Sequence, residues 1–430
     1  MWRNLAIICL LAPIVCASPA PAHAQLLNFM MDVISTGTRF NRVEPGGAVS
    51  GTVQSFEDFM TGIRREAVSG GISPELVERA FAGLTPDEWV LEKAGHQPEF
   101  VAPIWDYMDG AVSDARIALG AEALRDHARL LGSIEQTYGV DRHVLVAIWG
   151  MESTYGRLLA DDTLVRPIIR SLVSLAYLDP RRRKYARAQL FSALSIIERE
   201  GLVPELVVGS WAGAMGHTQF IPTTYEAYAV DFDGDGRRDL WTSVPDALAS
   251  TANYLSRSGW RRGATWGYEV TLPAGFDYAL AGHSMTLADW RARGIARTGA
   301  REFPRPGDEA ELLLPAGAQG PAFLMLRNYS VIKRYNSADS YALAVAHLSD
   351  RLRGGGAFAA AWPDHERVLG QDEREELQRL LIDRGFDTGG VDGRIGPLTE
   401  RALRDYQASV GLAPDGFATG SLLDRLRGDG

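Results

Sequence analysis

The sequence has little cysteine, no second long apolar run and no excess of basic residues. Its two cysteines, Cys9 and Cys16, lie within the first 24 of 430 residues. A chain cleaved after that segment would therefore lack disulfides, cysteine metal sites and thiol nucleophiles. No later segment is apolar and long enough to predict a membrane span. With 44 basic and 54 acidic side chains, the net charge of −10 argues against a general nucleic-acid binder.

The first 24 residues have the pattern of a secretory signal peptide. Arg3 precedes an apolar run over residues 5–17, and the small residues Ala22 and Ala24 offer a cleavage site before Gln25. The run is short for a membrane span. We therefore expect residues 1–24 to direct export and be removed. Retention of this segment as an N-terminal anchor is the alternative.

The rest of the chain has a globular composition, with 46% hydrophobic and 23% charged residues, and a length that suits two or three domains. Residues 25–54 are rich in Gly, Ser, Thr and Val, which predicts a flexible lead-in. Apolar spacing of three and four residues from Phe56 onward predicts a mainly α domain over 55–352. The helical stretches that we expect after Pro74 are 111–138, 141–155, 185–200, 244–257 and 338–352. Short strand patterns at 268–272 and 322–326 predict a small β insertion.

A glycine run at 354–356 marks a linker over 353–366, followed by a compact C-terminal unit over 367–430. Within this unit the turn at 392–397 is echoed by a second turn at 415–420, and each turn precedes a helix. This pattern predicts a small helical domain separate from the first.

Glu152 ends an apolar run over 144–151 that predicts a fully buried helix. Burial disfavours a charged carboxylate, so we expect a raised pKa and a group able to deliver a proton near neutrality. A structural glutamate paired with an arginine is the alternative, and the local sequence does not decide between the two.

The segment 209–222 alternates small residues with Trp211, Met215 and Phe220 and includes the polar residues Ser210 and Gln219. Such a composition suits a cleft wall that a flat ligand approaches closely. Tight helix packing through glycine is the alternative.

The segment 231–237 has acidic residues at positions one, three and five and glycine at position six, the start of a calcium loop. The glutamate usual at position twelve is replaced by Thr242. Asp239 and Asp246 are the acids that could complete the site. A solvated acidic turn is the alternative.

Two further clusters are less specific. A basic run at 181–184 is either a solvated helix start or a holder of substrate carboxylates. A polar-aromatic group near the end of the first domain suits either sugar stacking or ordinary packing, and consists of Asn328, Tyr329, Tyr335, Asn336 and Tyr341.

Taken together, these motifs resemble the membrane-bound lytic transglycosylase B family of peptidoglycan-cleaving enzymes. The resemblance runs from about Phe56 to Leu352 and rests on the residues 149–156, 210–222, 228–236, Tyr335-Asn336 and Tyr341-Ala342. The C-terminal unit separately resembles the three-helix peptidoglycan-binding domain. It does so through Leu380, Gly385, the turn at 392–399, Ala402 and Tyr406-Gln407. One departure is Thr223-Thr224, where the family commonly has serines.

The resemblance implies a lysozyme-like helical fold and a role for each matched residue. Glu152 matches the catalytic acid of the family. The residues implied to bind the glycan are Ser210, Gln219, Tyr335, Asn336, Tyr341, Arg181 and Arg182. The residues implied to hold a structural calcium ion are Asp231, Asp233, Asp235, Arg237 and Asp246. No organic cofactor, no nucleic acid and no particular protein partner is implied, and the location would be periplasmic, at the cell wall.

The implied reaction needs one carboxylate rather than the pair that most glycosidases use. Glu152 would protonate the oxygen that links N-acetylmuramic acid to N-acetylglucosamine. It would then take a proton from the C6 hydroxyl of the same sugar, giving a 1,6-anhydro end without water. The alternatives are a hydrolytic muramidase with a second acid at Asp161 or Asp162, and a non-catalytic wall-binding scaffold.

Overall fold

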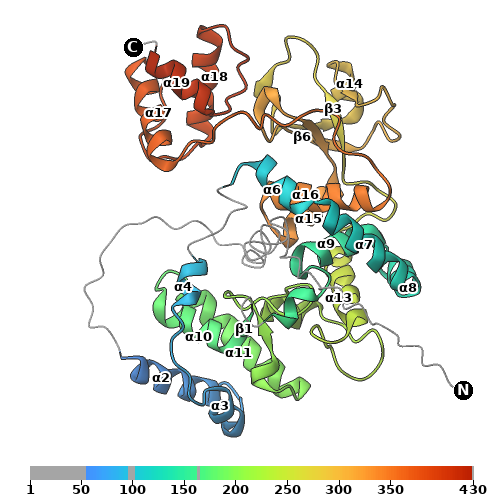
Figure 1. The fold of residues 1–430 in the computed structure, drawn as a ribbon, viewed down its shortest axis with the longest axis vertical. Coiled ribbons are helices and arrows are strands. Elements are labelled where there is room, and N and C mark those ends of the chain that lie inside the picture. The colour runs from blue at the N-terminus through green and yellow to red at the C-terminus, as the bar shows by residue number, and fades with distance from the viewer. Residues whose placement is uncertain (1–54, 95–101, 162–164, 429–430) are drawn as a thin grey trace, which may run out of the picture.

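The computed structural model describes residues 55–94, 102–161 and 165–428 (Figure 1). The predicted signal peptide, the lead-in over 25–54, both cysteines and Asp162 lie outside these ranges. Within them, no helix combines the length and the apolar composition that a membrane crossing requires.

The first domain is centred on helices α9 (Arg142–Ser153) and α16 (Asp339–Leu352), which pack against each other. Every α9 residue from Val144 to Ser153 is buried, as its unbroken apolar run predicts. The helices packed around this pair are α6 (Ile104–Ala111), α7 (Asp114–Asp126), α8 (Ala128–Tyr138), α13 (Val244–Arg257) and α15 (Arg327–Tyr335). The stretch predicted as one helix over 111–138 is two helices that meet at His127, and α15 was not predicted.

A second group of helices surrounds the antiparallel pair α10 (Ile168–Leu178) and α11 (Arg183–Glu200), in the lower part of Figure 1. Its other members are α2 (Phe56–Ser69), α3 (Pro74–Ala80), α4 (Trp89–Ala94) and α12 (Pro222–Tyr228). Two short strands, β1 (Arg166–Pro167) and β2 (Val208–Gly209), pair beside α10, with Arg166 opposite Gly209. This pair fixes the start of the segment 209–222 against the helices.

The β insertion is a five-stranded antiparallel sheet in the order β4-β6-β7-β3-β5. Its strands are β3 (Gly267–Thr271), β4 (Ser284–Thr286), β5 (Ala296–Arg297), β6 (Glu309–Leu313) and β7 (Ala322–Met325). The two predicted strands are β3 and β7, which pair with Tyr268 opposite Leu324. Helix α14 (Leu287–Ala292) places Trp290 in the separate apolar core of this sheet. The short 3-10 turns are η1 (Arg157–Ala160), η2 (Pro204–Leu206), η3 (Tyr278–Leu280) and η4 (Gly317–Gln319).

The C-terminal unit consists of α17 (Gln371–Asp383), α18 (Pro397–Ser409) and α19 (Gly420–Gly428) around an apolar core of its own. The two similar turns noted in the sequence are built alike. Gln378 donates its amide to the carboxylate of Asp392 and accepts the N–H of Gly393. Gln407 likewise donates to the carboxylate of Asp415 and accepts the N–H of Gly416.

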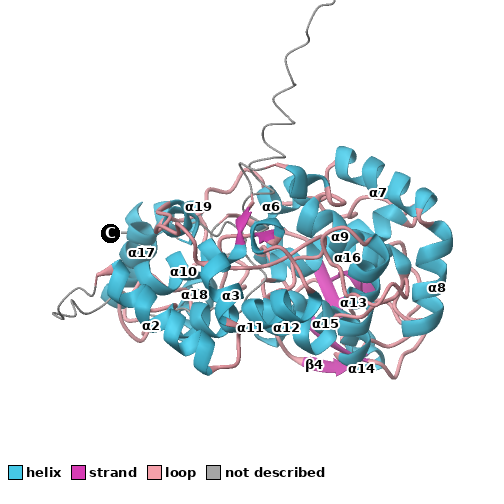
Figure 2. Cartoon of the chain, turned by 90° about the horizontal axis from the view of Figure 1, so that it is seen from below, coloured by secondary structure: helices cyan, strands magenta, loops and turns pink. Residues whose placement is uncertain are grey.

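The segment between the two domains lies against the first domain. The ring of Phe358 stacks on His347 with centroids 3.8 Å apart. Glu269 on β3 accepts hydrogen bonds from the main-chain N–H groups of Ala359 and Ala360. Asp415 in turn accepts the N–H of Ala318 at 2.7 Å, so the C-terminal unit sits beside the β sheet (Figures 1 and 2).

Candidate active site

Glu152 lies in the last turn of α9 and is 2% exposed. Asp141 caps the start of this helix by accepting the N–H of His143. The helix stops abruptly, because Thr154 and Tyr155 both have positive φ angles, of 51° and 59°. Two non-glycine residues in this region cost about 1–2 kcal/mol each. Such a turn persists only where the surrounding contacts compensate for it.

Those contacts come from the segment 209–222. Ser153 donates its hydroxyl to the carbonyl of His217 at 2.6 Å and accepts the N–H of Gly156 at 2.9 Å. The indole of Trp149 donates to Nδ1 of His217 at 3.0 Å. Gly156 is required here, since a Cβ at this position would lie 2.2 Å from the His217 ring. The residues 149–156 around Glu152 therefore hold the end of α9 against the loop that carries His217.

Tyr341, in the first turn of α16, donates its hydroxyl to Oε1 of Glu152 at 2.5 Å. Burial holds the pKa of Tyr341 well above its usual value, and the charge of Glu152 raises it further. The same two causes raise the pKa of Tyr335. Both hydroxyls therefore stay protonated at any physiological pH, and the acid has a neutral hydrogen-bond donor beside it.

Ser210 organises the first turn of the segment 209–222. Its side-chain oxygen accepts the N–H groups of Ala212 at 3.2 Å and Ala214 at 3.1 Å, and the residue is fully buried. Gly209 must lack a side chain, because a Cβ would lie 1.9 Å from the carbonyl oxygen of Ala214. The small residues of this segment thus allow a very tight fold of the main chain.

Gln219 and Asn336 each leave one buried polar atom unpaired. Gln219 donates its amide to Gly216 at 2.8 Å, but its Oε1 has no partner among the described residues. Asn336 accepts the N–H of Ala338 at 3.0 Å, while its Nδ2 is unpaired within the same ranges. An unsatisfied buried polar group costs about 1–3 kcal/mol. These two atoms are an acceptor and a donor that a polar ligand would satisfy.

Tyr335 has a packing role in the structure. Its hydroxyl donates to the carbonyl of Thr218 at 2.5 Å, and its ring contacts Phe220 and Tyr254. It therefore braces the segment next to Gln219 against α15.

The basic pair lies at the start of α11. Arg182 bonds to Asp179 at 2.5 Å, and its guanidinium lies 5.6 Å from the Trp211 ring. Arg181 is 3.5 Å from Asp179, with its side chain 56% exposed. Arg182 thus reaches the segment 209–222 through Trp211, while Arg181 faces outward.

The predicted calcium loop brings three carboxylates together. Ligand oxygens of Asp231, Asp233 and Asp246 all lie within 4.8 Å of one another. Asp246 lies in the first turn of helix α13 and is fully buried. Its two oxygens accept the N–H groups of Phe232 at 2.7 Å and Asp239 at 2.9 Å. Burial raises the pKa of Asp246, followed by the charge of Asp233.

The other predicted ligands have local partners. Asp235 accepts the N–H of Arg237 at 2.8 Å, and Thr242 bonds to Asp239. Arg237 could offer a main-chain carbonyl, because its side chain cannot bind a cation. The donor set of hard oxygens around the three acids fits a calcium ion.

Sequence reasoning missed His217, which lies inside a segment that was identified as unusual. The signal that could have identified it is a single titratable side chain set between the small residues Gly216 and Thr218. It also missed that Thr154 and Tyr155 take the left-handed conformation, for which no residue-level pattern exists.

Comparisons with known proteins show the family of each domain. Residues 55–350 match the family model described as "Transglycosylase SLT domain", and residues 370–426 match "Putative peptidoglycan binding domain". The chain is 34% identical over 222 residues to membrane-bound lytic murein transglycosylase B of Escherichia coli K12. That match covers 50% of this chain and 58% of the relative, so it spans less than two thirds of the relative's length.

Two solved structures are similar over most of the chain. SltB3 of Pseudomonas aeruginosa, solved in complex with NAG-NAM-pentapeptide, is 49% identical with a TM-score of 0.81. This match covers 87% of this chain and 100% of that one. The lytic transglycosylase Slt35 of Escherichia coli, solved in complex with calcium, is 26% identical with a TM-score of 0.60. It covers 73% of this chain and 98% of that one.

These matches confirm the predicted fold class, a mainly helical, lysozyme-like domain with a small sheet. They also confirm the resemblance on which the predicted site residues were named. Because the first family model covers well over half of the chain, the protein belongs to the transglycosylase SLT family of lytic murein transglycosylases, with a C-terminal domain of the peptidoglycan-binding family.

Proposed function

We propose that this protein cleaves the bond between N-acetylmuramic acid and N-acetylglucosamine in peptidoglycan and leaves 1,6-anhydro ends. Family membership supports the reaction class. The observation that carries the mechanism is the buried pair of Glu152 and Tyr341.

Glu152 acts first as the acid. Burial disfavours its charge and leaves a proton available for the glycosidic oxygen. After bond cleavage, the hydroxyl of Tyr341 stabilises the carboxylate, because a hydrogen bond to the charged form of an acid favours that form. Glu152 then removes the proton from the C6 hydroxyl, whose oxygen closes on C1. The new bond between C1 and the C6 oxygen replaces the glycosidic bond that breaks, so the reaction needs neither water nor an organic cofactor.

The glycan would be held by groups around this pair. Oε1 of Gln219 and Nδ2 of Asn336 supply the unpaired acceptor and donor, while Tyr335 braces the segment between them. Ser210 keeps its hydroxyl hydrogen for the acetamido oxygen, since its own oxygen already accepts two N–H groups. Arg182 would lie farther along the strand, beside Trp211, with the exposed Arg181 next to it.

A structural calcium ion would be held by Asp231, Asp233 and Asp246, with oxygens from Asp235 and Arg237. It would supply positive charge that ties the loop 231–237 to the start of α13. We further propose export through residues 1–24 to the periplasm, with residues 367–430 raising the local concentration on the wall.

The test is mass spectrometry of soluble products after the purified protein digests isolated peptidoglycan. The expected products end in 1,6-anhydromuramic acid, about 18 Da lighter than reducing ends because no water is added. Glu152→Gln is expected to lower the rate at least about 100-fold, the usual contribution of a general acid and base. Reducing ends would contradict the mechanism and indicate hydrolysis. Retained binding without any product would contradict the enzymatic proposal altogether.

The variant Tyr341→Phe tests the role of the tyrosine hydroxyl. It keeps Glu152 but removes the hydroxyl that donates a hydrogen bond to it. We expect a 10- to 100-fold lower kcat with the same product, since a hydrogen bond to a charged group contributes about 1.5–3 kcal/mol. An unchanged kcat would show that the hydroxyl plays no part in the reaction.

A further inference from the structure

The sequence motif around Glu152 contains two residues to which the proposed function gives no role, Gly150 and Tyr155. Tyr155 comes three residues after Glu152, and its N–H donates to the carbonyl of Trp149 at 3.3 Å. Its φ of 59° turns the chain back along α9, in a conformation that residues with a side chain rarely adopt. The side chain of Tyr155 therefore lies beside the helix that carries Glu152.

The ring of Tyr155 fills a slot between α9 and α7. A Cβ added at Gly150 on α9 would lie 2.5 Å from the Tyr155 hydroxyl oxygen, and a Cβ at Gly120 on α7 would lie at the same distance. The hydroxyl donates to the carbonyl of Arg116 on α7 at 2.9 Å. The ring also meets the Trp149 ring edge-on, with centroids 5.7 Å apart. Glycine on both sides of the slot leaves the room that the hydroxyl needs to reach its acceptor.

The residue that supplies this acceptor is itself held in place. Arg116 is fully buried, and its guanidinium donates to the carbonyls of Gly110 at 2.9 Å and Ala111 at 2.5 Å, in the last turn of α6. Carbonyls in a last turn have no donor within their own helix, and the helix dipole favours a cation there. Burial lowers the pKa of Arg116 to about 10, which leaves the guanidinium charged at neutral pH. Tyr155 therefore binds to a fixed joint between α6 and α7.

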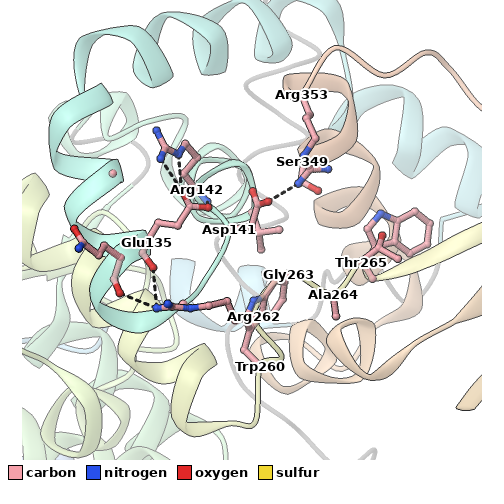
Figure 3. Close-up of a pocket in the computed structure, with 15 residues that line it drawn as sticks. Glu135, Asp141, Arg142, Trp260, Arg262, Gly263, Ala264, Thr265, Ser349 and Arg353 are labelled. Carbon is pink, nitrogen blue, oxygen red and sulfur yellow. Dashed lines mark hydrogen bonds and ion pairs between the residues drawn. The ribbon is translucent and has the colours of Figure 1, made fainter. Parts of the chain in front are cut away.

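The start of α9 has anchors of its own. Arg142 in its first turn pairs with Glu135 of α8 at 2.6 Å. Asp141, just before the helix, pairs with Arg353 at 2.8 Å (Figure 3). Helix ends fray more readily than helix middles, and Glu152 is the last residue but one of α9. The position of its carboxylate therefore depends on what holds the end of the helix rather than its start.

We propose that Tyr155 is the positioning residue that keeps the carboxylate of Glu152 within reach of the Tyr341 hydroxyl. The proposal rests on the proposed function and deepens it by naming what holds the acid in place. Glu152 comes from α9 and Tyr341 from α16, so their hydrogen bond needs the end of α9 to stay where it is. Displacing a catalytic group by about 1 Å can lower a rate by about 100-fold. Without the bond from Tyr155 to α7, the last turn of α9 is free to fray and this hydrogen bond lengthens.

The experiment compares two buried tyrosines that each lose only a hydroxyl in the full chain. Tyr155→Phe removes the donor to Arg116 and keeps the ring in its slot. The control Tyr225→Phe on α12 removes a hydroxyl that donates to the carbonyl of Arg238 at 2.6 Å. On soluble glycan strands we expect Tyr155→Phe to lower kcat about tenfold, with KM and the anhydro product unchanged. The control is expected to match the wild type in kcat and KM.

A second comparison separates positioning from a general gain in stability. If Tyr155 acts through the pair of Glu152 and Tyr341, the loss of its hydroxyl should matter little once that pair is broken. In the Tyr341→Phe background we therefore expect Tyr155→Phe to lower kcat by less than about threefold, instead of about tenfold. A tyrosine that only stabilises the fold would not show this coupling.

Three results would overturn the proposal. Tyr155→Phe could keep the kcat of the control, it could raise KM at unchanged kcat, or it could still lower kcat about tenfold in the Tyr341→Phe background. The second result would mean that Tyr155 serves substrate binding. The third would mean that it acts independently of the acid and its donor.

A wild type that cleaves no strand would contradict the proposed function rather than the role of Tyr155. In that case urea unfolding of the wild type, both single variants and the double variant measures the coupling between the two hydroxyls. A double variant that loses less free energy of unfolding than the two single variants together would support the positioning role. Losses that simply add would overturn it.

Discussion

At the scale of single residues, His217 connects the two segments that carry the site. Its carbonyl accepts the hydroxyl of Ser153, and its Nδ1 accepts the indole of Trp149. The ring is thus required in its neutral form, because a protonated Nδ1 cannot accept a hydrogen bond. Burial lowers the pKa of His217 to about 4.

This shift predicts a loss of stability in mild acid. The unfolded chain takes up a proton near the usual pKa of 6.5, whereas the folded protein does so near 4. The neutral His217 therefore stabilises the folded state fully above pH 6.5, and this stabilisation is lost as the pH falls through 4. The loss in the free energy of unfolding amounts to about 3 kcal/mol. We expect His217→Gln to unfold at a lower urea concentration than the wild type at pH 7. Its free energy of unfolding should, however, depend less on pH between 7 and 4.

The exposed His365 provides the matched control for this series. His365→Gln is expected to keep the pH dependence of the wild type, part of which belongs to His347, whose pKa burial also lowers to about 4. If the free energy of unfolding changed with pH to the same extent in both variants, the role given to His217 would be contradicted.

At the scale of elements, the end of α9 depends on a glycine that meets another segment. Gly156→Ala would place a Cβ 2.2 Å from His217 and force alanine to φ 83°. Gly201→Ala at the end of α11 meets the same restriction, at φ 63°, but has nothing within 4 Å of the added Cβ. We expect a loss of about 1 kcal/mol at Gly201 and of about 3 kcal/mol or more at Gly156. Urea unfolding of the two variants measures the difference in the free energy of unfolding. Equal losses would show that the contact between Gly156 and His217 does not contribute to stability.

The acidic loop before α13 gives a prediction about a metal. Adding calcium to metal-free protein is expected to raise Tm, because an ion that binds the folded state alone stabilises it. Asp233→Asn removes one of the three clustered charges and is expected to reduce that rise, while Asp289→Asn on α14 leaves it intact. A wild type whose Tm does not respond to calcium would contradict the proposed site.

At the scale of the whole molecule, one glutamate attaches the segment between the two domains. Glu269→Gln keeps one oxygen that can accept both N–H groups, but it replaces the second acceptor of the Ala359 N–H with a donor. It also removes the negative charge that strengthens the hydrogen bonds to Ala359 and Ala360. We expect faster chymotrypsin cleavage at Phe358 and Trp362, with fragments identified by mass spectrometry. Glu311→Gln on β6, exposed and on the same sheet, is the control. Equal cleavage rates would show that stacking on His347 alone holds the segment.

Several parts of this architecture are readable from short stretches of sequence. Burial of α9 follows from eight consecutive apolar residues, and strands β3 and β7 follow from their composition. The acid loop is also local, because its first three acids lie within five residues. Helix α15 was missed although its buried residues Tyr329, Ile332 and Tyr335 recur at helical spacing, because the segment is short and polar on average.

Local sequence patterns are enough to predict that Glu152 is a buried acid, that the fold is mainly helical, and that a small second unit follows a glycine-rich segment. These features depend on neighbours in the chain, whose spacing is visible in the letters. Those patterns do not reveal that Tyr341, 189 residues away, donates to Glu152. Nor do they reveal that Gln219 and Asn336 each leave an atom unpaired among the described residues. Contacts between distant segments depend on how helices and sheet pack, and packing leaves no periodic trace in the sequence.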